Sequence, residues 1–161
     1  MCDKNKILKV TGITIDNIVL KKQICIGNNL YNIPIKYLVN NLIIQTPIIF
    51  IPFTINKYKG HNYLDISFLN SEIDKEMSLF KKFIIDFNKY IETIIKKKNK
   101  NLEFVNSIKK SNSIFPDRLR LSIDDNILVF NDKKQLIEFD MIQPKIYSKL
   151  LISPLCIWKN N

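Results

Sequence analysis

The sequence predicts an α+β fold, mainly β, with a small antiparallel barrel or curled sheet and one long amphipathic helix. Short runs rich in Ile, Phe and Val alternate with turn residues along most of the chain. A single apolar stripe with steps of three and four residues runs from Ile73 to Ile94. The 161 residues are 46% apolar, which is enough to build the core of a single domain spanning residues 1–161.

Three strands are expected in the first 35 residues. They cover residues 7–15, 23–27 and 30–35, each rich in Ile, Val or Tyr. The sequence Gly27-Asn28-Asn29 between the second and the third is typical of a tight turn.

A long uncharged stretch follows, with no charged residue between Lys36 and Lys57. A membrane-spanning helix needs about 20 apolar residues in an unbroken run. Here Pro47 and Pro52 would break a helix twice, and polar side chains interrupt the stretch. We therefore expect buried strands with a bend between them, inside a closed sheet, and no membrane span.

The next segment predicts a hairpin. Strands are expected over residues 48–58 and 63–69, joined by a loop at residues 59–62. In the second strand, apolar residues alternate with Asp65 and Ser67, as in a strand with one buried and one exposed face.

The long helix is expected at about residues 71–98. Ser71 is the predicted N-cap, with Asp74 three residues later in the position of a capping box. Acidic residues at the start and Lys96, Lys97 and Lys98 at the end suit the helix dipole. The wide apolar face favours docking on a sheet over a coiled coil.

The remainder of the chain returns to strand patterns. Residues 118–123 alternate Leu119, Leu121 and Ile123 with Arg118, Arg120 and Ser122. A hairpin is expected from residues 126–130 and 135–139, joined by a loop at residues 131–134. Two final strands are expected over residues 146–152 and 155–158.

Several classes of function are disfavoured. Three glycines do not form a Gly-rich phosphate loop, and the scattered Cys2, Cys25 and Cys156 predict reduced thiols in an intracellular protein. The single histidine, His61, is expected in an exposed loop, and the acidic residues Asp124, Asp125 and Asp132 are expected to form turns. We therefore predict no enzymatic activity, no cofactor and no metal site.

The charge favours a polyanionic partner. The chain carries 25 Lys and Arg against 15 Asp and Glu, a formal net charge of +10. An abundance of Ile, Lys and Asn is typical of AT-rich genomes, so part of the lysine excess reflects codon usage. The high isoelectric point attracts nucleic acid whatever its origin.

A small β-barrel can bind single strands by stacking bases on exposed aromatic side chains while basic groups neutralise phosphates. The candidate nucleic-acid-binding residues are Lys57, Tyr58, Lys59, His61, Tyr63, Lys96, Lys97, Lys98, Arg118 and Arg120. Two alternatives stay open for members of this set. Tyr58 and Tyr63 could be cross-strand packing partners, and the three lysines could be a solvated helix end.

A pattern of weak motifs in a fixed order resembles a family found across the nucleocytoplasmic large DNA viruses. Its motifs here are residues 44–47 (IQTP), the hairpin around Asn131-Asp132, the turn at residues 142–145 (IQPK) and the terminal Ile157-Trp158 strand. The resemblance spans roughly residues 34–158. Members of that family resemble phage-type single-stranded DNA-binding proteins with an OB-fold.

The resemblance implies an OB-like fold and sequence-independent binding of single-stranded DNA, with RNA as the other possible ligand. It also implies a role in viral replication, recombination or repair, in the host cytoplasm or nucleus. The alternative is a non-enzymatic structural or protein-interaction module derived from such a fold.

Two features of the family are missing here, an acidic tail and a strand after the tryptophan. The missing strand predicts an open sheet edge near residues 146–157 and self-association through it. In the alternative arrangement, residues 7–18 cover that edge within one molecule.

Overall fold

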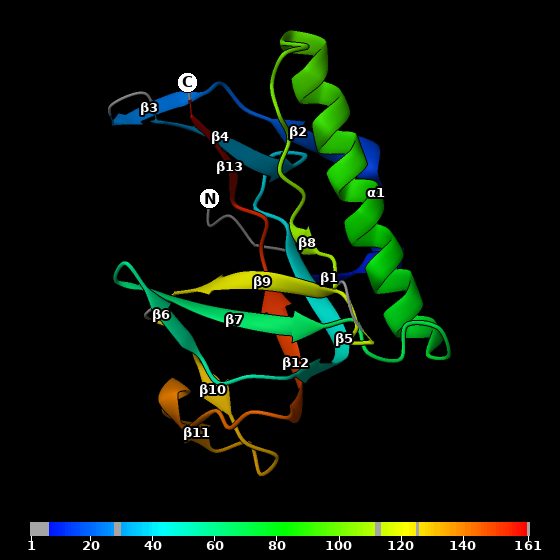
Figure 1. The fold of residues 1–161 in the computed structure, drawn as a ribbon, viewed down its shortest axis with the longest axis vertical. Coiled ribbons are helices and arrows are strands. Elements are labelled where there is room, and N and C mark those ends of the chain that lie inside the picture. Colours follow the sequence, from blue (N-terminus) through cyan, green and yellow to red (C-terminus); the bar gives the residue numbers. More distant parts are fainter. Residues whose placement is uncertain (1–6, 28–29, 112–113, 125, 161) are drawn as a thin grey trace. The chain divides into compact units, whose positions relative to one another are not determined.

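A computed structural model describes residues 7–27, 30–111, 114–124 and 126–160 (Figure 1). The fold is α+β and mainly β, with one long helix and a strongly curled sheet, which confirms the predicted fold class in its curled-sheet form. Predictions made for Cys2, Asn28, Asn29 and Asp125 lie outside the described residues.

The chain divides into two compact units. Unit 1 contains Met1–Pro47 and Lys149–Asn161, and unit 2 contains Ile48–Ser148. Two strands, β5 (Ile43–Ile51) and β12 (Ile146–Ile152), contribute residues to both units.

Unit 1 is built around strand β4 (Leu30–Tyr37). The antiparallel partners of β4 are β2 (Ile18–Leu20), β3 (Ile24–Gly27) and the terminal strand β13 (Cys156–Asn160). Strand β1 (Ile7–Lys9) pairs in parallel with the first residues of β5. The strands predicted at residues 23–27, 30–35 and 155–158 are therefore present with small shifts at their ends.

The N-terminal segment departs from the sequence-based expectation. The strand predicted over residues 7–15 ends at Lys9 and is followed by two 3₁₀ turns, Val10–Gly12 and Ile15–Asn17. Gly12 lies where the strand would have to continue, and glycine weakens strands. The arrangement in which this segment covers β12 is also not the one observed, because β1 pairs with β5 and β2 with β4.

Strand β5 accommodates Pro47, whereas the strand predicted over residues 48–58 is interrupted after Ile51. Leu150 donates its backbone N–H to the side-chain oxygen of Thr46, the buried residue before Pro47. Pro52 follows the last strand residue, and proline has no N–H to extend a ladder. The uncharged stretch thus contains a strand, and among the described residues no helix is long and apolar enough to cross a membrane.

Unit 2 contains the central antiparallel ladder of β7 (His61–Ser67) and β9 (Arg118–Ile123). The outer partners are β5 and β6 (Asn56–Tyr58) on β7, and β8 (Ile108–Lys109) on β9 (Figure 1). A separate hairpin joins β10 (Val129–Phe130) to β11 (Leu136–Ile137), as predicted, and a 3₁₀ turn follows at Phe139–Met141.

The β6–β7 hairpin is tighter than predicted. Its loop is only Lys59-Gly60, with φ of 49° and 81°, as a two-residue type I′ turn requires. Gly60 adopts this left-handed conformation at little cost. His61 consequently lies in strand β7, opposite Tyr58, and the prediction that it sits in a loop is wrong.

The helix α1 runs over Lys75–Lys98. Asp74, not Ser71, is its N-cap, because the Asp74 carboxylate accepts the backbone N–H of Met77 at 3.0 Å. The ring of Phe80 contacts that of Phe68, which follows β7, with centroids 6.0 Å apart. Further along, Asn88 hydrogen-bonds to Ser107 beside β8. Helix α1 therefore docks on the sheet, as its wide apolar face predicted.

Candidate nucleic-acid interface

The strand register gathers five of the predicted binding residues on one face of the sheet of unit 2. In an antiparallel ladder, directly opposed residues point to the same face. The opposed pairs on this face are Tyr58–His61, Asn56–Tyr63, Tyr63–Ser122, Asp65–Arg120, Ser67–Arg118 and Phe50–Ser67. We call the side chains of Tyr58, His61, Tyr63, Arg118 and Arg120 the aromatic–basic face.

The opposite face of the same ladder is apolar. Leu64 pairs with Leu121, and Ile66 with Leu119. Phe68 continues this series and contacts α1. Because the helix lies against these residues, the aromatic–basic face is the side of the ladder turned away from α1.

A buried carboxylate lies at the centre of the aromatic–basic face. Asp65 is only 2% exposed. Arg120 donates to it through Nε at 2.7 Å and Nη2 at 2.9 Å, and Arg118 Nη1 lies 3.6 Å from the same carboxylate. The two guanidinium groups are therefore held close together by one shared counter-ion, and the three residues together carry a charge of about +1.

The electrostatics keep Asp65 ionised. The hydrogen bonds from Arg120 lower the pKa of the Asp65 carboxyl, burial opposes this, and the positive charges of Arg120, Arg118 and Lys109 lower it further. The Nη1 group of Arg120 takes no part in the pair with Asp65. It is a donor that a phosphate oxygen can use without breaking the ion pair.

Sequence reasoning missed the role of Asp65. Its alternating strand suggested an exposed polar face, but Asp65 and Ser67 are both buried. The reason is that two arginines from the neighbouring strand point to the same face, and the guanidinium of Arg118 also lies 5.2 Å from the ring centre of Phe53. An acidic position in one strand and alternating arginines in another were the available signal, but their register was unknown.

The hairpin residues divide between the two faces. Tyr58 is 63% exposed, and the Lys59 ammonium lies 5.3 Å from the centre of its ring. Tyr58 and Tyr63 are diagonal neighbours, because the residues directly opposite them are His61 and Asn56. Lys57 pairs with Asn62, one position out of phase with Tyr58, and so lies on the other face.

The three lysines of the helix end lie elsewhere in unit 2. Lys96, Lys97 and Lys98 occupy the last turn of α1, and Lys96 forms an ion pair with Glu92. Lys96 is sixteen residues beyond Phe80, or about 24 Å along the helix axis. The structure therefore does not bring these lysines together with the aromatic–basic face.

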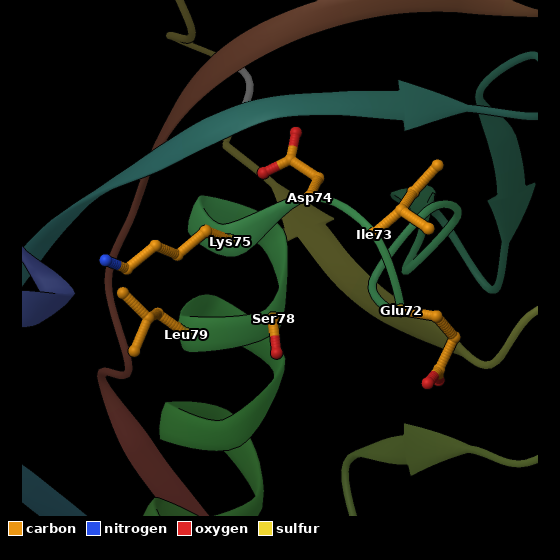
Figure 2. Close-up of a pocket in the computed structure, with 6 residues that line it drawn as sticks. All are labelled: Glu72, Ile73, Asp74, Lys75, Ser78 and Leu79. Carbon is orange, nitrogen blue, oxygen red and sulfur yellow. The ribbon is translucent and has the colours of Figure 1, made fainter.

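A hollow at the start of α1 offers a less suitable site. Figure 2 shows its lining residues, which are Glu72, Ile73, Asp74, Lys75, Ser78 and Leu79. Two of the six are acidic, and Asp74 already caps the helix. An anionic ligand would meet negative charge here, so the hollow does not compete with the sheet face as a nucleic-acid site.

The acidic residue Asp124 forms hydrogen bonds within its own turn. Asp124 accepts hydrogen bonds from the backbone and side chain of Asn126, as expected of a turn former. Among the described residues, no group of three or more His, Cys, Asp or Glu side chains lies close enough to hold a metal ion.

The sequence matches no protein-family model, and neither a curated protein nor a solved structure matches it significantly.

Proposed function

We propose that this protein binds single-stranded DNA without sequence preference through the aromatic–basic face. The observation that carries the proposal is the register of β6, β7 and β9, which aligns two tyrosines, a histidine and two arginines on one side of the antiparallel sheet. These residues come from segments more than 50 positions apart in the sequence.

The chemistry of this face suits an unpaired strand. An exposed tyrosine ring such as that of Tyr58 stacks on the flat faces of bases, which are available only when the strand is not in a duplex. Every base has such a face, so stacking does not select a sequence. Arg120 lies between the tyrosines and the Ser67 end of β7, and Arg118 lies at that end, where both can neutralise backbone phosphates.

The wider charge supports the same ligand. A net charge of +10 favours encounter with a polyanion from any direction. Lys59 above Tyr58 and Lys109 opposite Arg118 add positive charge at the two ends of the face. A role in viral replication, recombination or repair, and a location in the host cytoplasm or nucleus, rest on the family resemblance alone.

The test is a titration of labelled oligo-dT against the full chain, followed by fluorescence anisotropy at several salt concentrations. Each phosphate contact on a single strand contributes about −0.7 to the slope of log affinity against log salt. We expect a slope that corresponds to several contacts. Affinity that does not change between low and physiological salt would refute the proposal, and the same titration with oligo-U compares DNA with RNA.

The alternative function is a protein-interaction module, and one feature of unit 1 favours it. Trp158 of β13 is opposite Asn32, which is also opposite Ile24 of β3, so all three share a face of that sheet. Trp158 and Ile24 are 63% and 54% exposed. Light scattering tests self-association through this region, and a monomer over a wide concentration range would count against it.

A further inference from the structure

We infer that Phe50 and Tyr147 form a second base-stacking platform, so that the nucleic-acid site of unit 2 has aromatic groups at both ends and cations between them. The inference rests on the proposed function. It adds that the bound strand runs along β7 and that the site extends from one aromatic platform to the other.

The contact between the two rings is direct. Phe50 belongs to β5 and Tyr147 to its neighbour β12, and their ring centroids lie 5.1 Å apart at an angle of 45°. Tyr147 is 58% exposed. A ring this exposed, supported from one side by a second ring, leaves a surface on which a base can stack.

The register places this pair on the same side as the aromatic–basic face. Phe50 is opposite Ser67, and Ser67 is opposite Arg118, so all three point to one face. Lys109 extends the same row, because it is opposite Arg118 on β8. Ile49 and Ile51, which point the other way, are buried.

The two platforms are separated along β7. Tyr58 is opposite His61 at one end of the strand, and Phe50 is opposite Ser67 at the other. The six steps from His61 to Ser67 along an extended strand span about 20 Å. Arg120, opposite Asp65, lies between these two rows, and Arg118, opposite Ser67, lies in the row of Phe50.

The positive charge along the surface between the two platforms suits a polynucleotide better than an apolar ligand. Arg118 lies in the row of Phe50 and also contacts the ring of Phe53. Bases that stack at the two ends would place the intervening phosphates over the two guanidinium groups. The occupant is therefore a single strand that runs along β7 between the two platforms.

The length of the strand provides the test. A stacked strand advances about 3.4 Å per nucleotide, so dT3 covers roughly 10 Å and reaches only one platform. A dT12 strand reaches both. The experiment compares the affinity of wild-type protein, Tyr147→Ala and Tyr147→Phe for dT12 and dT3, with dT3 measured by competition at low salt.

We expect Tyr147→Ala to weaken dT12 binding about tenfold, from the loss of one stacked base. The affinity for dT3 should change at most about twofold, because the Tyr58 platform remains. Tyr147→Phe should bind as wild type. Leu151→Ala, at another exposed position of β12, is the matched control and should change neither affinity.

The outcomes separate the two proposals. If Tyr58→Ala weakens binding but Tyr147→Ala binds dT12 as wild type does, the second platform is refuted and the proposed function stands. An equal loss for dT3 and dT12 in Tyr147→Ala would refute the two-platform arrangement. If the wild-type protein binds neither oligonucleotide, both proposals fail.

Discussion

The two faces of the β7–β9 ladder contrast sharply, although their residues alternate along the same strands. One face consists of Leu64, Ile66, Leu119 and Leu121 and continues into Phe68, which packs on α1. The other carries aromatic and basic groups around a buried carboxylate. The contrast teaches that neighbouring residues in one strand can build the core on one side and, under the proposed function, a binding surface on the other.

The largest expected effect comes from the apolar face. Phe80 is fully buried against Phe68, so Phe80→Ala should lower the free energy of unfolding by about 3–5 kcal/mol. Urea unfolding followed by circular dichroism measures this loss. Leu79→Ala, one residue earlier and 39% exposed, is the control and should cost far less. Equal losses for the two variants would contradict the packing described for α1.

The second prediction concerns Asp65, which is buried and also pairs with the two arginines of the aromatic–basic face. Because its folded pKa is lowered, ionised Asp65 stabilises the fold above the ordinary carboxyl pKa of 3.8, and this stabilisation is lost as the pH falls below that value. Asp65→Asn should lower the free energy of unfolding by about 1–3 kcal/mol at pH 6.

Unfolding of the wild type and of Asp65→Asn should be compared at pH 6 and below pH 3. The difference in stability should shrink at the lower pH, because the stabilisation from the ionised wild-type carboxyl declines as the pH falls below 3.8. A difference that is the same at both pH values would show that the ion pair with Arg120 and Arg118 does not stabilise the fold.

The third prediction concerns the aromatic–basic face alone. Tyr58→Ala should weaken oligo-dT binding by about 1–3 kcal/mol, the range for a lost base stack. Its melting temperature should change little, since Tyr58 is exposed and lies on the outer strand β6. Tyr58→Phe keeps the ring and serves as the control. Unchanged affinity in a folded Tyr58→Ala sample would remove this residue from the site.

The smallest effect is expected at the helix end. Replacement of Lys96, Lys97 and Lys98 by Gln removes three charges that lie apart from the aromatic–basic face. The slope of log affinity against log salt should change by less than the value for one phosphate contact, about 0.7. A change in slope equal to two phosphate contacts or more would show that the interface includes the helix end. It would also weaken the contrast between the two faces of the ladder.

Much of the local structure could be predicted because it depends on neighbouring residues. The periodicity of residues 73–94 predicted α1, and the alternation of residues 118–123 predicted β9 with its observed bounds. The aromatic and basic candidates of the hairpin and of β9 were also visible, since an exposed strand face has a period of two residues.

Other features depended on contacts between distant segments. The exposed position assigned to Asp65 was wrong because its partners, Arg118 and Arg120, are more than 50 residues away and their register is set by strand pairing. The stacking of Phe50 on Tyr147 likewise joins strands nearly 100 residues apart. Neither pairing can be predicted from the local sequence pattern. The alternation along a strand indicates which of its residues share a face, but it does not indicate which strand lies beside it.

By itself the sequence determined the basic charge, the helix, most of the strands and the residue types available for binding. Only the tertiary structure decided that Tyr58, His61, Tyr63, Arg118 and Arg120 share one face while Lys57 and the helix lysines do not. The physical reason is that side-chain direction alternates along a strand, so a face exists only once the register between strands is set.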